Sequence, residues 1–372
     1  MIYLVAGTRP NFMKVAPIWR ALHARKFATR LMHTGQHFDK SMSDVFFHDL
    51  GMPEPDARLQ AGGGTHAEQT AAVIVGVEKD LLAHRPRTVV VVGDVTSTLA
   101  AALAAAKLGI PVVHVEAGLR SGDWTMAEEI NRVLTDRISD LLLTPSPDAE
   151  ENLLREGIPR ARIRFVGNVM IDSLHWARAR PTDALARFGL RAGDYALATL
   201  HRPANVDTRD ALIATLDALA TIAARVPLLF PVHPRTTARA KELGLAERLR
   251  ETPGLRTTEP IGYDDFVTLM TTATLVATDS GGIQEETTAL GVPCLTMRQG
   301  TERPVTVTQG TNVIVGLDVV KIACEVDAVL AGRPKRGTIP EGWDGETAGR
   351  IADAIERLLL GEPRPMTAGP RA

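Results

Sequence analysis

The sequence has little cysteine and no long apolar run. Its two cysteines, Cys294 and Cys324, belong to no CxxC motif and no Cys/His cluster, which argues against a disulfide framework and against structural zinc. No apolar segment reaches the length needed to cross a bilayer, and residues 1–5 are too short for the core of a signal peptide. We therefore expect a protein of the reducing cytoplasm that does not bind membranes.

The sequence also lacks an excess of either charge. Its formal net charge is -2 at pH 7, and acidic and basic residues are interleaved along the chain. Nucleic acids and anionic membranes bind to broad basic faces, and this pattern provides none. We therefore expect no nucleic-acid partner.

What the sequence does have is a regular alternation of strand-like and helical segments. With 372 residues, 45% of them apolar, the chain is longer than a usual single domain, so two domains are the default expectation. Helical stretches such as 99–108 separate short apolar runs, a pattern typical of parallel α/β sheets. The strand-like runs are IYLVA, VVVV, PVVHVE, YALATL, LLFPVH, LVATD and PCLTM.

The two halves of the chain resemble each other. VVVVGD, a helix and LGIPVVHVEAGLR in the first half correspond to LVATDSGG, a helix and LGVPCLTMRQGTER in the second. Each half is therefore predicted to form its own doubly wound sheet. Ligands of such sheets bind beyond the carboxyl ends of the strands, so we expect a site in a cleft between two facing sheets.

Breaks in the pattern suggest the domain limits. Gly157, Pro159 and Gly167 interrupt the chain before Asn168, which predicts a first domain at 1–168 and a second at 169–343. A helix is predicted at 344–361. The Pro- and Gly-rich segment 362–372 is predicted to be disordered.

The segment 278–310 is the most informative part of the sequence. Apolar residues 275–277 end a predicted strand, and a helix is predicted to begin near Ile283. The first N–H groups of a helix have no intrahelical partner and lie at its positive end, so a diphosphate placed there is stabilised. The turn between strand and helix consists of Asp279, Ser280, Gly281 and Gly282.

Two acids follow in the first turn of this predicted helix. Glu285 and Glu286 favour the helix dipole, and either could also accept hydrogen bonds from ribose hydroxyls. The alternative interpretation is an ordinary strand-turn-helix joint, in which Asp279 or Ser280 only caps the helix.

Carboxylates follow two neighbouring strands of the first half. Asp94 comes after VVVV, and Glu116 ends PVVHVE, so both are predicted at the same sheet edge if these strands are neighbours. The structural alternatives are a helix cap for Asp94 and simple exposure for Glu116. We favour a functional role for Glu116, because an acid beside a buried strand end usually has one.

A second acidic element lies nearby. Thr125 and Glu128 match a capping box, so Glu128 could serve only to start the helix predicted at 129–139. Arg132 lies one turn after Glu128 on the same helix face, where a solvated ion pair is the structural alternative.

Basic side chains follow strands of both halves. His201 and Arg202 come directly after YALATL, and their chemistry suits a diphosphate, whereas His233 after LLFPVH could equally be a buried, satisfied histidine. Lys14 lies one turn beyond the loop after IYLVA. That loop has neither GxGxxG nor GxxxxGK spacing, so neither a dinucleotide site nor a P-loop is indicated.

These motifs together resemble the non-hydrolysing UDP-N-acetylglucosamine 2-epimerases, from Gly7 to Gly316. The resemblance implies a GT-B architecture of two Rossmann-like domains, with the C-terminal helix returning to the first domain. It also implies interconversion of UDP-GlcNAc and UDP-ManNAc through elimination of UDP, and a homodimer. The matching segments are GTRPNFMKVAP, TGQHFD, VVGDVTSTLAAALAA, VHVEAGLRSGD, EEINR, VGNVMIDSL, LHRP, PVHP, TDSGGIQEE and GTERPVTVTQGT.

The resemblance also implies roles for individual residues, and neither a metal nor a redox cofactor. The catalytic set implied in this way is Asp94, Glu116, Glu128, Arg132 and His201. The implied UDP-binding set is Arg9, Lys14, Arg202, His233, Ser280, Gly281, Gly282, Glu286 and Arg303.

Some positions depart from the family pattern. Ala127 and Ala204 replace a proline and a glutamate that are frequent there, which affects substrate choice more than reaction type. Gln36 and His37 match part of an allosteric region of regulated members, whereas the neighbouring residues differ. Alternatives that share the motifs or the fold are a hydrolysing epimerase, an epimerase of a related UDP-2-acetamido sugar, a GT-B glycosyltransferase and a non-catalytic UDP-sugar sensor.

Overall fold

The computed structural model describes residues 1–35 and 50–361, which form two compact α/β units. The first unit contains Met1–Ser173 and the segment that begins at Glu341, and the second contains Leu174–Pro340. The division therefore falls after Ser173, inside helix α7 (Val169–Arg178), rather than after Asn168.

Some predictions lie outside the described residues. They concern Gln36 and His37 and the tail 362–372, and the side chain of Arg9 is likewise not described. Within the ranges that the structure describes, no helix has the length and apolar character of a membrane span.

The first unit is built on a seven-stranded sheet in which every strand pair is parallel. The strand order is β3-β2-β1-β4-β5-β6-β7, so the order reverses between β1 and β4. Its strands are β1 (Ile2–Ala6), β2 (Thr29–His33), β3 (Ala57–Arg58), β4 (Thr88–Val92), β5 (Val112–Val115), β6 (Leu141–Thr144) and β7 (Ile163–Phe165).

The second unit repeats this order in a six-stranded parallel sheet, β10-β9-β8-β11-β12-β13. Counted from the start of each unit, the first six strands follow the same sequence of neighbours, 3-2-1-4-5-6, which is the Rossmann order. The predictions of a doubly wound sheet in each half and of a parallel α/β fold are confirmed. The strands are β8 (Ala196–Thr199), β9 (Leu228–Pro231), β10 (Leu255–Thr258), β11 (Leu275–Thr278), β12 (Cys294–Thr296) and β13 (Asn312–Ile314).

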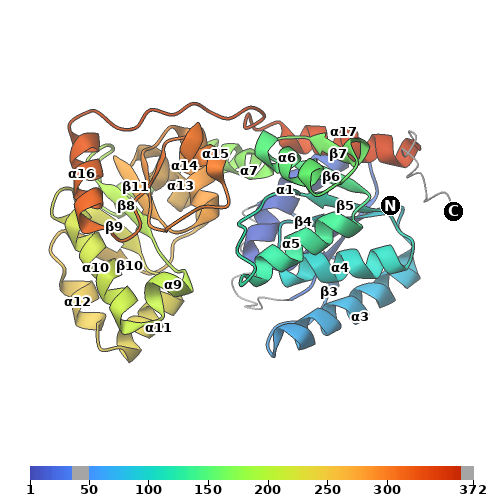
Figure 1. Ribbon diagram of the computed structural model, residues 1–372, viewed down its shortest axis with the longest axis horizontal. Helices are drawn as coiled ribbons and strands as arrows, with labels where there is room; N and C mark the ends of the chain where they lie inside the picture. Colours follow the sequence, from blue (N-terminus) through green and yellow to red (C-terminus); the bar gives the residue numbers. More distant parts are fainter. Residues whose placement is uncertain (36–49, 362–372) are drawn as a thin grey trace. The chain divides into compact units, whose positions relative to one another are not determined.

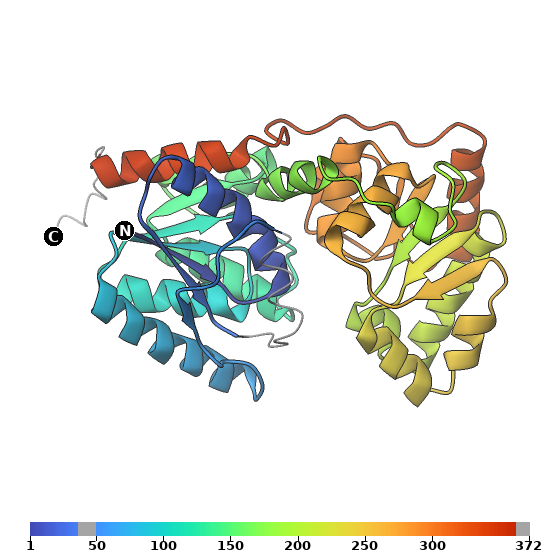
Figure 2. The same cartoon turned by 180° about the vertical axis from the view of Figure 1, so that it is seen from behind.

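Helices cover both faces of the first sheet (Figures 1 and 2). Helices α3, α4 and α5 pack side by side on one face, and α1 and α17 pack together on the other. Buried alanines of α4, including Ala101 and Ala105, allow close approach to its neighbours. The helices of this unit are α1 (Arg9–Ala24), α3 (His66–His84), α4 (Thr96–Lys107), α5 (Ala127–Ile138), α6 (Pro147–Arg155) and α17 (Thr347–Leu360).

The second unit follows the same plan. Helix α10 packs against α9 and α16, and α13 packs against α8 and α14. The helices are α8 (Ala184–Arg187), α9 (Pro203–Val206), α10 (Arg209–Ala223), α11 (Pro234–Glu242), α12 (Ala246–Glu251), α13 (Tyr263–Thr272), α14 (Gly281–Leu290), α15 (Pro304–Thr308) and α16 (Val319–Leu330).

The C-terminal helix α17 begins at Thr347, later than the predicted start at 344. Asp344 instead forms a turn, in which its carboxylate accepts the N–H of Glu346 at 3.0 Å and pairs with Arg350. The first N–H groups of α17 donate to Asp172 of α7, that of Thr347 at 3.2 Å and that of Ala348 at 2.7 Å. A distant, buried carboxylate therefore caps this helix.

We predict that Asp172→Ala destabilises the first unit by about 1–3 kcal/mol, because two buried N–H groups lose their acceptor. The free energy of unfolding in urea measures this. Asp353→Ala is the matched control, since it removes only an exposed carboxylate of α17 that pairs with Arg25, and it should change the free energy by less than about 1 kcal/mol. Equal losses for the two variants would contradict the capping role.

Candidate active site

Two carboxylates lie at the carboxyl edge of the first sheet. Asp94 follows β4 and Glu116 follows β5, and these strands are adjacent, with Val92 paired to Val115. The condition for placing both acids at one sheet edge, that the two strands are neighbours, is therefore met. The edge is also close to the point where the strand order reverses, which is where ligands of such sheets bind.

Glu116 has an unusual backbone. Its φ angle is 70°, in the left-handed region that non-glycine side chains rarely adopt. The conformation brings the N–H groups of Glu116 and Ala117 onto one acceptor, the carbonyl oxygen of Leu143, at 3.0 and 3.1 Å. Strained backbone of this kind persists mainly where function requires it.

The Glu116 carboxylate pairs with the Lys14 ammonium of α1. Both side chains are nearly buried, with 8% and 9% of their surface exposed, so the alternative that Glu116 is merely exposed is wrong. The start of α1 is itself fixed to the sheet, because the Asn11 amide donates to the carbonyl oxygen of Val92 at 3.1 Å. Lys14 is therefore presented to Glu116 from a rigid helix.

Asp94 pairs with Arg132 of α5. It does not cap α4, whose N-cap residue is Val95, so the capping interpretation of Asp94 is wrong. Arg132 is 3% exposed and binds Glu129 as well as Asp94, so it is not part of a solvated ion pair. Burial of this guanidinium between two carboxylates fixes the position of Asp94.

Glu128 and Glu129 have different surroundings. Helix α5 begins at Ala127 with Met126 as N-cap, so Glu128 does not complete a capping box with Thr125, and its side chain is exposed. Glu129 is buried and accepts the N–H groups of Ser121 and Gly122. Burial opposes its ionisation, whereas these bonds and Arg132 bring the pKa of Glu129 below its ordinary value.

Asp279 organises the loop that follows β8 in the second unit. Its carboxylate is fully buried and accepts the N–H of His201 at 3.1 Å, the N–H of Arg202 at 2.9 Å and the Asn205 amide at 3.0 Å. Asp279 therefore serves the neighbouring loop and is not the cap of α14. It fixes the backbone of two residues that the sequence assigned to a diphosphate.

Three arginines surround two buried glutamates at the carboxyl edge of the second sheet. Arg202, Arg298 and Arg303 contact Glu302 at 3.1, 2.8 and 2.8 Å, and Arg303 also contacts Glu285 at 2.8 Å. Burial opposes the ionisation of Glu302, but the arginines bring its pKa far below its ordinary value. The three arginines outnumber the two glutamates. The cluster therefore has an excess of one cationic side chain and suits an anion.

Helix α14 begins at this arginine cluster. Ser280 is the N-cap, and its side chain makes no capping hydrogen bond. The helix begins at Gly281, where a Cβ atom would lie 2.5 Å from Nη1 of Arg303. The absence of a side chain at this glycine therefore leaves room for the guanidinium. The first N–H groups of a helix have no intrahelical partner, and together with the adjacent Arg303 cation they are suited to bind an anion, the kind of ligand that the sequence predicted here.

Glu286 lies one turn further along α14, 1% exposed. Its Oε1 accepts the Tyr263 hydroxyl at 2.6 Å, and its Oε2 is buried and has no hydrogen-bond partner in the part of the chain that the structure describes. Burial raises the pKa of Glu286 to about 7. The unmatched oxygen is suited to accept a hydroxyl hydrogen from a ligand.

His233 is exposed, so the interpretation as a buried histidine is wrong. Its Nδ1 accepts the N–H of Arg235 and caps α11. The His201 ring stacks on it with ring centroids 5.3 Å apart, and His201 Nδ1 lies 3.4 Å from Asp279. The structure thus groups His201 with His233 and with the Asp279 loop.

Sequence reasoning missed several residues of these networks. Glu129 was passed over beside Glu128, Asp279 was interpreted as a turn residue or a helix cap and not as the acceptor for the neighbouring loop, and Tyr263 and Arg298 were not considered. Arg298 could have been found, because it follows a strand just as Glu116 does. Partners such as Tyr263, which comes from another helix, leave no local signal in the sequence.

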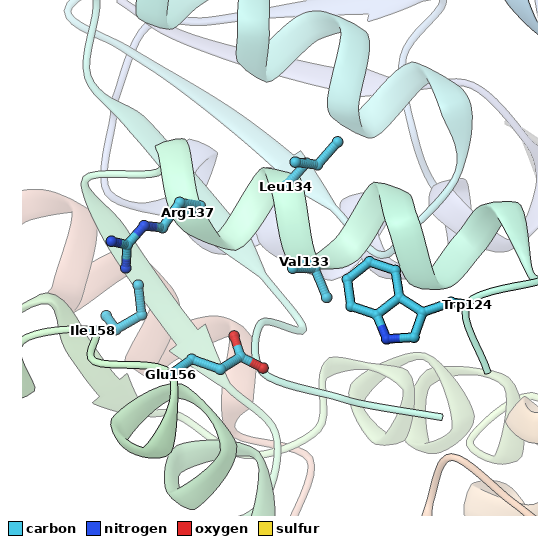
Figure 3. Close-up of a pocket in the computed structure, with 6 residues that line it drawn as sticks. All are labelled: Trp124, Val133, Leu134, Arg137, Glu156 and Ile158. Carbon is cyan, nitrogen blue, oxygen red and sulfur yellow. The ribbon is translucent and has the colours of Figure 1, made fainter. Parts of the chain in front are cut away.

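A pocket of about 340 Å³ is found elsewhere, along the outer side of α5 (Figure 3). It contains none of the predicted site residues. Within the described ranges, no cluster of three or more His, Cys, Asp or Glu residues could hold a metal ion. The pocket is lined by Trp124, Val133, Leu134, Arg137, Glu156 and Ile158.

Comparisons with known proteins place the chain in one family. Residues 20–356 match the family model for UDP-N-acetylglucosamine 2-epimerase. A UDP-N-acetylglucosamine 2-epimerase of Methanocaldococcus jannaschii is 42% identical over 94% of this chain and 97% of that protein. A UDP-2,3-diacetamido-2,3-dideoxy-D-glucuronate 2-epimerase of Pseudomonas aeruginosa is 43% identical over 96% of this chain and 99% of that protein.

Solved structures show the same likeness. The structure of Methanocaldococcus jannaschii UDP-GlcNAc 2-epimerase in complex with UDP-GlcNAc and UDP matches with a TM-score of 0.88 and 41% identity, over 95% of this chain and 99% of that chain. Acinetobacter baumannii MurG matches with a TM-score of 0.52 and 12% identity, over 96% and 99%, which concerns the fold alone. The predicted GT-B architecture is confirmed.

We predict that stability falls with rising pH because of Glu286. Its folded-state pKa of about 7 lies above the ordinary 4.5, so its contribution is fully present below about pH 4.5 and is lost as the pH rises through 7. The loss between these limits is on the order of 3 kcal/mol. Urea unfolding measures this. Between pH 5 and pH 8, the free energy of unfolding should fall less for Glu286→Gln than for the wild type.

Tyr263→Phe is the matched control. The tyrosine hydrogen bond lowers the pKa of Glu286, so its removal should move the loss of stability to higher pH. Equal pH dependence in Glu286→Gln and the wild type would show that Glu286 does not titrate in this range.

Proposed function

Because the chain belongs to the UDP-N-acetylglucosamine 2-epimerase family, we propose that it interconverts UDP-GlcNAc and UDP-ManNAc without hydrolysing them. The supporting observation is the division of charge between the two sheet edges. The first carries the paired carboxylates Asp94 and Glu116, and the second carries an arginine cluster beside the start of α14. Proton transfer needs carboxylates, and a diphosphate leaving group needs positive charge such as the arginine cluster provides.

The reaction has two balanced halves. A carboxylate takes the C2 proton while the bond from C1 to the diphosphate oxygen breaks, and the electron pair leaves with UDP to give 2-acetamidoglucal. The diphosphate oxygen then bonds to C1 again, and an acid delivers a proton to the opposite face of C2. No electrons are gained or lost, so the chemistry requires no redox cofactor.

The first unit supplies the acids in this proposal. Lys14 and Arg132 hold the Glu116 and Asp94 side chains in place, and a carboxylate is able to take a proton. Glu128, exposed at the start of α5, is the third acid. Arg132 acts as a positioning residue because it contacts Asp94.

The second unit supplies most of the groups that bind UDP, and Arg9 and Lys14 come from the first. The start of α14 and Arg303 hold the diphosphate, Glu286 accepts the ribose hydroxyls, and His201 protonates or orients the leaving phosphate. The proposed UDP-binding set is Arg9, Lys14, Arg202, His233, Ser280, Gly281, Gly282, Glu286 and Arg303. We also propose a cytoplasmic homodimer that supplies ManNAc units for cell-surface polysaccharide.

A second candidate substrate is a UDP-2,3-diacetamido uronic acid. The 43% identical Pseudomonas aeruginosa relative carries that activity in its name. The elimination at C2 is the same for both sugars, so the catalytic residues do not distinguish them. Comparison of kcat/KM for the two sugars distinguishes the candidates, and the larger value identifies the substrate.

We predict that UDP-GlcNAc incubated with the protein in heavy water acquires deuterium at C2 in both epimers. The exchange follows from removal of the C2 proton and return of a solvent proton, and an NMR time course measures it. Free ManNAc and stoichiometric UDP would instead indicate a hydrolysing enzyme. An absence of both exchange and products would contradict the epimerase.

We predict that Asp94→Asn and Glu116→Gln lower kcat for epimerisation about 10²–10⁴-fold, since general acid-base catalysis contributes that much. Calorimetric titration should give UDP affinities close to that of the wild type, because the start of α14, Arg303 and Glu286, which hold the diphosphate and the ribose in this proposal, lie in the second unit. Glu151→Gln, an exposed acid of α6, is the control and should keep full activity. Unchanged turnover in either active-site variant would remove that residue from the mechanism.

A further inference from the structure

One buried ion pair of the first unit has no role in the mechanism above. His114, at the centre of β5, and Asp136, on α5, are both fully buried. His114 Nδ1 lies 2.7 Å from Asp136 Oδ1, and His114 Nε2 lies 2.8 Å from the carbonyl oxygen of Gly93. A charged pair in a sheet interior is costly unless its remaining bonds are satisfied.

The remaining bonds of the pair are satisfied by the second oxygen of Asp136. Asp136 Oδ2 accepts the N–H of Gly118 at 3.1 Å and the Arg120 guanidinium at 2.8 Å. Both ring nitrogens of His114 thus face oxygen atoms, one of the Asp136 carboxyl group and one of the Gly93 backbone carbonyl.

The backbone groups that the pair binds belong to the loops that carry the acids. Gly93 directly precedes Asp94, and Gly118 lies two residues after Glu116. Both glycines have positive φ angles, 68° and 84°, and a Cβ atom at Gly118 would lie 2.3 Å from the carbonyl oxygen of Ala149. The loops are thus bent sharply at the points where the pair holds them.

The pair also connects these loops to α5. Asp136 lies one helical turn after Arg132, the residue that binds Asp94, and Glu128 lies in the first turn of α5. One hydrogen-bonded unit therefore links the loop of Asp94, the loop of Glu116 and the helix of Glu128. A shift of about 1 Å between reacting groups can lower a rate about 10²-fold.

We propose that His114 and Asp136 are positioning residues that set the relative placement of the three acids for proton transfer at C2. The inference rests on the proposed function. A purely structural pair would affect only folding stability. A positioning pair lowers kcat and leaves the binding of UDP unchanged, because among the described residues neither His114 nor Asp136 contacts a member of the proposed UDP-binding set, and most of that set lies in the second unit.

Three conservative variants separate the contacts. His114→Gln keeps a donor near the Nε2 position, His114→Asn keeps one near the Nδ1 position, and Asp136→Asn keeps the shape without the charge. We expect each to lower kcat for epimerisation about 10–100-fold, as loss of a supporting hydrogen bond does elsewhere. KM and the UDP dissociation constant should stay within about twofold of the wild type.

Val113→Ala is the matched control. Val113 is the fully buried neighbour of His114 on β5 and takes no part in the hydrogen-bonded unit, so this variant loses stability through a cavity alone. At a temperature where every variant is folded, its kcat should remain near the wild-type value. If Val113→Ala loses as much kcat as His114→Gln at an equal loss of thermal stability, the positioning role is overturned.

The double variant His114→Gln with Asp136→Asn tests whether the pair acts as one unit. We expect its kcat to equal that of the less active single variant, because the effects of substituting residues that act together are not additive. A fold-loss of kcat equal to the product of the two single fold-losses would show that the two residues do not act as one unit. Wild-type protein without C2 exchange would overturn the proposed function, whereas active wild type with unaffected variants would overturn this inference alone.

Discussion

A carboxylate that leaves water must be paired with a cation or with N–H groups, because its desolvation otherwise drives it to the neutral form. This constraint governs both sheet edges of the protein. Lys14 compensates Glu116, and Arg132 compensates both Asp94 and Glu129. Backbone N–H groups compensate Asp279. Each compensation also removes the freedom of a side chain or a loop, so the same contacts that permit burial give the site its geometry.

The two units have the same strand order, but the side chains at equivalent points of their sheet edges have opposite charges. Counted from Pro111 and Pro293, Glu116 of the first unit corresponds to Arg298 of the second. The strand registers likewise relate Asp94 to Gly281, the first residue of α14. An acid at one sheet edge and the start of helix α14 at the other thus arise at equivalent points of a repeated fold. Function differs between the units because side chains differ there while the topology does not.

The sequence was a good guide wherever the signal was local. Apolar runs such as those of β4 and β11 predicted buried parallel strands, and the residues after them predicted where polar groups gather. It failed where a partner came from a distant segment. Asp279 looked like the cap of its own helix, yet it binds the loop after β8. Glu128 looked like a capping residue, yet Glu129 is the buried partner of Arg132.

The sequence by itself determined the fold class, the repeat and the set of side chains available at the strand ends, because these depend on periodicity and on neighbours along the chain. Only the tertiary structure decided which ions pair, which carboxylate is buried and which histidine is held at both nitrogens. His114 illustrates the difference, since its two partners come from another helix and another loop. Burial and pairing depend on packing between distant segments, and no local pattern encodes them.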